Sequence, residues 1–206
     1  MSIAQQLATD RVVTVDSWLP EDIRQAILAE VSKCEFGATK FKNQNGDKEE
    51  TGMQHTNNFA SRYDQFTPEL QQIAGGLKNR IALLVGVCGC RIQNPLLNFY
   101  PVGAKIGTHH DAYANTAEDK LYVNGNNVDL TCMITIQAPI KGGETNFPVI
   151  QKHTLSVNNC ITVWQNLQGT DADGYGIRDE NMLHEGKTVL EGEKYILVYL
   201  VKQKAI

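Results

Sequence analysis

The stretch Gly107-Thr108-His109-His110-Asp111-Ala112 places two potential metal ligands on one short β-strand. In an extended strand, residues i and i+2 point to the same side, so His109 and Asp111 can converge while His110 points away. A second histidine, His184, lies far downstream. Two imidazoles and one carboxylate can occupy one face of an octahedral ion and leave three coordination positions open. We therefore expect His109, Asp111 and His184 to form a metal site.

Further motifs surround these residues, and they matter because a lone His-x-Asp pair often occurs by chance. Asn98-Phe99-Tyr100-Pro101-Val102-Gly103 comes before the pair, and Gly142-Gly143-Glu144-Thr145-Asn146-Phe147-Pro148 comes between the pair and His184. Lys194 follows His184 by ten positions and opens the apolar run Tyr195–Val201.

This ordered set resembles the 2-oxoglutarate- and Fe(II)-dependent dioxygenases, and most closely their prolyl 4-hydroxylase branch. In that branch Tyr-x-Pro-Gly, His-x-Asp, Gly-Gly-Glu-Thr-x-Phe-Pro and His-x-Gly follow in this order, with a lysine ten residues after the last histidine. The resemblance covers residues 94 to 202 and extends more loosely to Val12–Leu28. It implies that His109, Asp111 and His184 hold Fe(II), with the open positions taken by 2-oxoglutarate and O2.

The same resemblance assigns residues to the cosubstrate. Lys194 would meet the far carboxylate of 2-oxoglutarate, since a dicarboxylate that loses its hydration in a protein interior needs a fixed cation there. Tyr100 would donate its hydroxyl to the cosubstrate. Thr135 stands where many relatives have a tyrosine, and its hydroxyl could still bond the carboxylate. Thr131 and Met133 share the face of Thr135 and could line the pocket.

The reaction implied by the resemblance is hydroxylation of an unactivated C–H bond, with ascorbate needed in vitro. A prolyl residue in a peptide or protein is the first candidate substrate. Another amino-acid residue or a small molecule is the alternative, because fold and metal site do not determine the substrate. Trp164, Tyr195 and Tyr113 are candidate aromatic residues of the substrate pocket, although core packing is an equally good interpretation of Trp164 and Tyr195.

Two other functional classes are compatible with parts of the pattern. A metal hydrolase could use His109, Asp111 and His184 for Zn²⁺, but it would need a positioned general base and no site for an oxo acid. Lys194 and Tyr100, in register with the metal motif, argue against this class. A non-catalytic binding domain could keep the fold, but such proteins usually lose a metal ligand, and this chain has all three.

The second half of the chain predicts a fold rich in β-strands. Short strand-like runs with turn signals between them are typical of a sandwich or distorted barrel. The resemblance specifies a mainly β fold with supporting helices (α+β), built on a double-stranded β-helix core of the jelly-roll, cupin-like kind. The expected strands are Ile92–Tyr100, Gly107–Tyr113, Val128–Gln137, His153–Ser156, Cys160–Gln165 and Lys194–Lys202.

The first third of the chain predicts supporting helices after one strand, Val12–Val15. One helix should begin with Pro20 in its first turn, and a second at Thr67-Pro68-Glu69, although the pair Gly75-Gly76 disfavours that second helix. We expect a single oxygenase domain over residues 1–206, with helical support in 1–90 and the double-stranded β-helix in 91–206.

Composition narrows the partners and the compartment. The net charge of −4 gives no basic footprint, so a nucleic-acid partner is not expected. No apolar stretch reaches membrane-spanning length and no signal peptide is recognisable, which favours a cytoplasmic protein without membrane contact. The five cysteines have no zinc spacing, and we expect Cys88 and Cys90 to be reduced core residues. The sequence specifies no oligomeric state.

Overall fold

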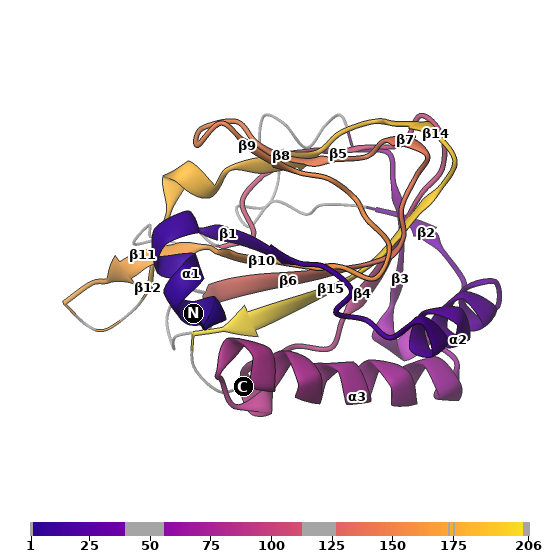
Figure 1. The fold of residues 1–206 in the computed structure, drawn as a ribbon, viewed down its shortest axis with the longest axis horizontal. Helices are drawn as coiled ribbons and strands as arrows, with labels where there is room; N and C mark the ends of the chain where they lie inside the picture. Colours follow the sequence, from indigo (N-terminus) through magenta and orange to yellow (C-terminus); the bar gives the residue numbers. More distant parts are fainter. Residues whose placement is uncertain (1, 40–55, 113–126, 173, 175, 204–206) are drawn as a thin grey trace.

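The computed structural model describes residues 2–39, 56–112, 127–172, 174 and 176–203. Tyr113, expected in the substrate pocket, lies outside the described residues. Within them, the fold is mainly β, with two facing sheets and helices on the outer side of the larger one (Figure 1).

The larger sheet has seven antiparallel strands in the part of the chain that is described. In spatial order they are β1 (Val12–Val15), β10 (Ile161–Gln165), β6 (Val128–Gln137), β15 (Lys194–Lys202), β4 (Leu96–Tyr100), β3 (Phe59–Arg62) and β2 (Gly37–Ala38). The two long central strands, β6 and β15, are apolar over most of their length and pair with each other along it. Both strands have the bounds that the sequence predicts, because a long strand that is buried along its length has a clear apolar pattern from its first residue to its last.

The smaller sheet lies above the larger one in Figure 1. Its order among the described strands is β5 (Ile106–His109), β13 (His184–Gly186), β8 (Thr145–Phe147) and β9 (Lys152–Thr154). Two short pairs complete the β-structure that is described: β11 (Leu167–Thr170) with β12 (Gly176–Arg178), and β7 (Lys141–Gly142) with β14 (Val189–Glu191).

Helices cover the outer face of the larger sheet. α3 (Pro68–Val85) runs along it, α2 (Glu21–Val31) lies beside α3, and α1 (Ile3–Asp10) packs near the strand β1 (Figure 1). Helix α3 starts as the sequence predicts, with the Thr67 hydroxyl accepting from the Leu70 amide, and it continues through Gly75 and Gly76. Helix α2 begins one residue later than predicted, because Pro20 is its N-cap. Three single-turn 3₁₀ helices, η2 (Tyr63–Gln65), η3 (Gly89–Arg91) and η4 (Glu180–Met182), connect described elements.

The two faces of the larger sheet bury different side chains. Against the helices, a large apolar cluster includes Ile134, Leu197 and Tyr199 from the central strands. Between the sheets, a second cluster is smaller and is interspersed with buried polar groups. It consists of Val12, Tyr100, Ala104, Met133, Phe147, Trp164, Met182, Val189 and Ile196. The inter-sheet space is therefore where chemistry can take place.

Two expectations from the sequence need correction. The first 90 residues do more than provide helices and the predicted strand Val12–Val15 (β1), because they also contribute β2 and β3 to the larger sheet. Cys88 and Cys90 are neither reduced nor buried: both are exposed and form a disulfide, because the 3₁₀ turn η3 brings their Cα atoms to 5.3 Å.

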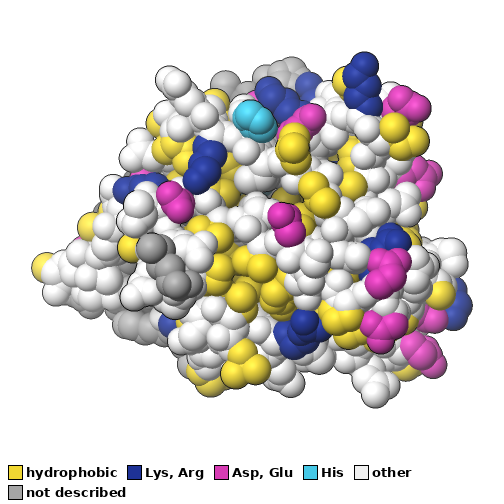
Figure 2. Space-filling view, in the orientation of Figure 1, with side chains coloured by type: hydrophobic (Ala, Val, Ile, Leu, Met, Phe, Trp, Pro, Cys, Tyr) yellow, Lys and Arg dark blue, Asp and Glu magenta, His cyan; other side chains and the backbone are white. Residues whose placement is uncertain are grey.

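On the face that Figure 2 shows, the surface has no large patch of charged side chains of one sign only. Lysine and arginine side chains alternate with aspartate and glutamate around a central group of hydrophobic side chains. None of the helices in the described part of the chain is long and apolar enough to cross a lipid bilayer.

Candidate metal centre

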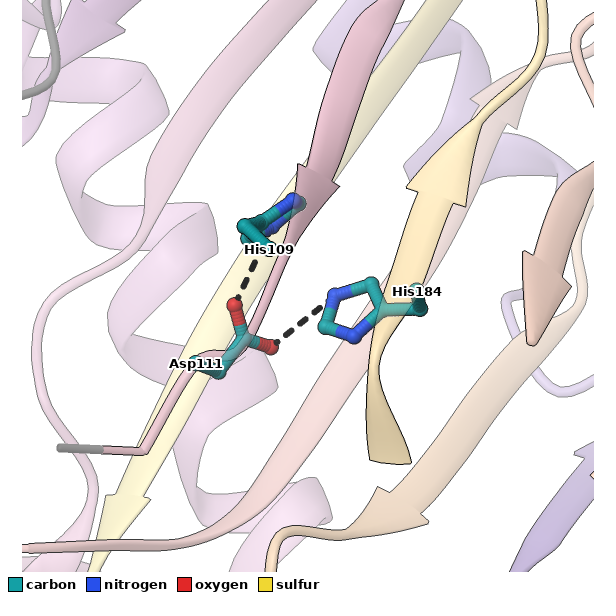
Figure 3. A group of neighbouring side chains, drawn as sticks. All are labelled: His109, Asp111 and His184. Carbon is teal, nitrogen blue, oxygen red and sulfur yellow. Dashed lines mark ion pairs between the residues drawn. The ribbon is translucent and has the colours of Figure 1, made fainter. Parts of the chain in front are cut away.

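The three predicted ligands converge between the sheets (Figure 3). His109 ends β5 and His184 begins β13, and the two residues are directly opposite each other in the antiparallel pair. Asp111 lies two residues past His109, just beyond the end of the strand. One potential ligand atom from each of the three side chains lies within 4.8 Å of the others. The imidazole rings are 4.3 Å apart between centroids.

The backbone fixes the orientation of both histidine rings in the same way. His109 Nδ1 lies 2.8 Å from the Gly107 carbonyl oxygen, and His184 Nδ1 lies 2.9 Å from the Met182 carbonyl oxygen. A carbonyl only accepts, so Nδ1 carries the proton in each ring and Nε2 is the atom with a lone pair. Both Nε2 atoms point toward Asp111, at 3.4 Å from Oδ1 for His109 and 3.6 Å from Oδ2 for His184. This is the tautomer that a metal ligand requires.

The carboxylate of Asp111 has a hydrogen-bond partner on the larger sheet. Thr131 Oγ1, on β6, donates to Asp111 Oδ2 at 2.6 Å. Asn166 Nδ2 in turn donates to Thr131 Oγ1 at 2.9 Å. Thr131 is fully buried and Asn166 is 2% exposed. Two successive hydrogen bonds, from Asn166 to Thr131 and from Thr131 to Asp111, therefore fix the position of the Asp111 side chain.

The charges in the site suit a cation. Burial by itself would raise the pKa of Asp111, but the His184 and His109 rings and the Thr131 hydroxyl together hold it well below its usual value. Burial lowers the pKa of His184 to about 4, against the partial opposing effect of Asp111. The carboxylate is thus ionised and His184 is neutral at pH 7, the protonation states in which these side chains bind metal.

Lys194 supplies a second charge on the same face of the larger sheet. It opens β15 directly opposite Tyr100 of β4, and its Nζ lies 5.4 Å from the centroid of the Tyr100 ring. The side chain is 2% exposed, and Nζ donates to the Gly143 carbonyl oxygen at 2.7 Å. Burial lowers the pKa of Lys194 to about 8 and raises that of the Tyr100 hydroxyl. None of the carboxylates among the described residues pairs with this buried ammonium, and an unpaired buried charge is costly.

Two further buried polar atoms face this space without a partner among the described residues. Thr135 lies opposite Ile196 of β15 and therefore on the face of Lys194, and its Oγ1 makes no hydrogen bond. Trp164 packs against the ring of His184 at 5.1 Å between centroids, and its Nε1 is likewise unpartnered. Buried polar atoms normally have partners, so both atoms indicate room for a polar ligand.

Gly142 is the last residue of β7, and Gly143 follows it in the turn that leads to β8. Their φ angles are +81° and +74°, a region that glycine enters without steric cost. This turn presents the Gly143 carbonyl to Lys194. Gly186, two residues after His184, has a different role, because a Cβ there would meet Ile106 Cγ2 of the neighbouring strand at 2.7 Å. Gly186 therefore permits close strand packing.

The structure places Tyr195 away from this site. It follows Lys194 in β15 and so points to the opposite face, where it stacks on Phe99 at 4.7 Å between centroids and contacts Phe36. The expectation that Tyr195 lines the substrate pocket is wrong. Sequence reasoning also missed Asn166 and the bond from Thr131 to Asp111. No motif signals either, because each depends on the pairing of β6, β10 and the segment after them.

Comparison with solved structures agrees with this architecture. The chain matches a viral collagen prolyl hydroxylase from Paramecium Bursaria Chlorella virus-1, in its 2OG complex, with a TM-score of 0.68 and 15% identity, over 96% of this chain and 98% of the other. It also matches a prolyl hydroxylase of Trichoplax adhaerens in complex with a hypoxia inducible factor peptide fragment (TM-score 0.67, 14% identity, 98% and 87% covered). A Pseudomonas putida prolyl-4-hydroxylase matches with a TM-score of 0.63 and 13% identity, over 98% of each chain.

The chain has the prolyl hydroxylase fold. The fold expected from the sequence motifs is thereby confirmed, with His109, Asp111 and His184 between the two sheets of that fold. At these identities the likeness concerns the fold alone. No family model and no curated protein sequence matches the chain.

Proposed function

We propose that this protein is an Fe(II)- and 2-oxoglutarate-dependent dioxygenase that hydroxylates an unactivated C–H bond. The observation that carries the proposal is the placement of the His109, Asp111 and His184 ligand set and the buried ammonium of Lys194 in one inter-sheet space. A metal hydrolase explains the ligand set but gives no role to Lys194, whose burial is costly without an anion.

Fe(II) would be held by His109 Nε2, His184 Nε2 and the Asp111 carboxylate. When bound, iron supplies the redox chemistry that couples decarboxylation of 2-oxoglutarate to oxidation of a C–H bond. Lys194 would receive the far carboxylate of the cosubstrate, with the Thr135 hydroxyl as a second donor. The rings of Phe147 and Trp164, which pack against His184, would keep bulk water from the reacting atoms.

For the substrate we propose a prolyl residue in a peptide. The support is the fold, shared with solved prolyl hydroxylases, one of which was determined with a peptide fragment. Another amino-acid residue or a small molecule is the alternative, since a shared fold does not determine the substrate.

The first test is succinate release by the Fe(II)-loaded protein with 2-oxoglutarate, O2 and ascorbate. Wild type is expected to turn over slowly without substrate, and His109→Ala is expected to release no succinate. His153→Ala is the matched control, because His153 is exposed on β9 outside the site. Calorimetric binding of 2-oxoglutarate to the anaerobic Fe(II) protein is measured on the same samples. If wild type neither binds 2-oxoglutarate nor releases succinate, the oxygenase proposal fails and the zinc hydrolase becomes the first candidate.

The substrate class is tested separately with paired peptides that differ only in proline against alanine. Faster succinate release, together with a product heavier by one oxygen atom for the proline peptide alone, is the expected result. Equal responses to both peptides would reject the prolyl substrate without affecting the oxygenase proposal.

A further inference from the structure

The hydrogen-bond chain behind Asp111 has a fixed direction. Thr131 has a single hydroxyl proton, and its oxygen already accepts from Asn166 Nδ2 at 2.9 Å. The ionised carboxylate of Asp111 can only accept, so the Thr131 proton must go to Asp111 Oδ2, at 2.6 Å. Both donors are buried and the Asp111 side chain is 14% exposed, so each bond of the chain is strengthened and water competes little for it.

This chain treats the two carboxylate oxygens differently. Both oxygens lie near an imidazole Nε2, Oδ1 at 3.4 Å from His109 and Oδ2 at 3.6 Å from His184, but Oδ2 also carries the short hydrogen bond from the larger sheet. An oxygen that already accepts a charge-assisted bond is a poorer metal ligand than its neighbour. Coordination through both oxygens would take one of the three positions that a facial two-histidine, one-carboxylate site leaves open.

We propose that Thr131, oriented by Asn166, is a positioning residue that restricts Asp111 to one metal-bound oxygen. The inference rests on the proposed function, and it adds the reason why three coordination positions stay open. Thr131 touches neither substrate nor cofactor in this scheme; it acts through the carboxylate.

Asn166 joins this chain to the strand that carries the third ligand. Its backbone carbonyl accepts from the Asp179 amide at 2.8 Å, and Asp179 caps η4, which leads directly into His184. The Asp179 carboxylate is itself paired with Arg11. One buried asparagine therefore links the supports of two ligands that are far apart in the sequence.

The test uses Co(II), whose visible absorption reports the ligand set, added anaerobically to the full chain. Thr131→Val keeps the side-chain shape and removes the donor. It is expected to weaken Co(II) binding about 10- to 100-fold, the usual effect of removing an outer hydrogen bond to a metal ligand, and to change the visible spectrum. Thr131→Ser restores the hydroxyl and is expected to restore both properties.

Thr162→Val is the matched control. Thr162 is also a fully buried threonine, on β10 and on the same face of the sheet, but its hydroxyl pairs with that of Thr14 at 3.1 Å. It is expected to lose comparable stability while keeping the wild-type Co(II) affinity and spectrum. Equal changes in both variants would show a general structural effect and overturn the inference.

Asn166→Ala tests the second bond and serves if Thr131→Val does not fold. It is expected to weaken Co(II) binding by a smaller factor, because the Thr131 hydroxyl loses its orientation but keeps its proton. Wild-type affinity and spectrum in Asn166→Ala, or in Thr131→Val, would overturn the inference and leave the oxygenase proposal standing. Failure of the wild type to bind Co(II) would overturn the metal site itself.

Discussion

Replacing Lys194 with methionine is expected to stabilise the metal-free protein while removing its affinity for 2-oxoglutarate. Lys194 is 2% exposed, and burial lowers the pKa of its ammonium to about 8. At pH 7 the folded protein therefore holds a charge in surroundings that disfavour it. Methionine has a similar length and flexibility but no charge, so it can fill the same space.

The magnitude follows from the pKa. The fall from the ordinary value of 10.5 to about 8 corresponds to roughly 3 kcal/mol of lost stability at pH 7, at about 1.4 kcal/mol per pKa unit. Losing the hydrogen bond to the Gly143 carbonyl costs about 1 kcal/mol. That carbonyl is not orphaned, because Ser156 Oγ also donates to it at 2.9 Å. The net gain for Lys194→Met is therefore about 1–2 kcal/mol.

The stability difference between Lys194→Met and wild type should also depend on pH. Below pH 8 the folded lysine is charged and its burial cost is fully present. Between pH 8 and 10.5 the folded lysine loses its proton before the unfolded one, so the cost shrinks. The stability advantage of Lys194→Met over wild type should therefore be largest at pH 7 and smaller at pH 9.5.

Urea unfolding of the metal-free proteins at both pH values measures this difference, and calorimetry with 2-oxoglutarate measures the lost binding. Lys141→Met is the control, because Lys141 is exposed and its replacement should change the unfolding free energy by less than about 0.5 kcal/mol. The reasoning is refuted if Lys194→Met is the less stable protein at pH 7, or if its difference from wild type does not change with pH. Retained 2-oxoglutarate binding would refute the assignment of Lys194 to the cosubstrate.

Three other predictions concern the site and the turn beside it. Burial lowers the pKa of His184 to about 4, so as the pH falls the unfolded chain takes up this proton before the folded one. The free energy of unfolding of the metal-free protein, measured with urea, should therefore fall by up to roughly 3 kcal/mol between pH 6.5 and 4. The same measurement on His184→Gln should show a smaller fall. Gly142→Ala should destabilise the protein by about 1–3 kcal/mol, because φ is +81° and a Cβ would clash with a backbone carbonyl. Gly76→Ala, in the open middle of α3, should stabilise it by about 1 kcal/mol. Thermal melts that ranked the two variants alike would contradict this prediction. Co(II) should quench the fluorescence of Trp164, because its ring lies beside His184. Trp164→Phe should therefore abolish the quenching. Trp18→Phe should preserve it, because Trp18 lies on the helix side of the sheet.

The parts of the fold that the sequence predicts are those with a local signal. β6 and β15 are long apolar runs, and α3 has a capping threonine before a proline, so these elements are visible without knowledge of their neighbours. Strands such as β13 and β14 have three residues each, and only pairing with distant segments makes them strands. Such short elements carry no periodicity that a sequence could show.

The residues of the candidate site also differ in whether the sequence carries a local signal for them. His109, Asp111 and His184 were predictable because the ligand types stand in an ordered set of motifs. Asn166 was not, because its contact with Thr131 depends on how three chain segments pack. Tyr195 was avoidable as an error: neighbours in a strand point to opposite faces, so assigning Lys194 to the site already excluded Tyr195 from it.

The direct register of His184 against His109 gives a bound ion a mechanical role. β13 is only three residues long and pairs with β5 and with β8 at two positions each. An ion bound by both histidines would act as a clamp across β5 and β13, and local opening of this edge would then require the ion to leave. Hydrogen exchange at the amides of β13 should consequently slow when metal is added, while exchange in α3 should not change.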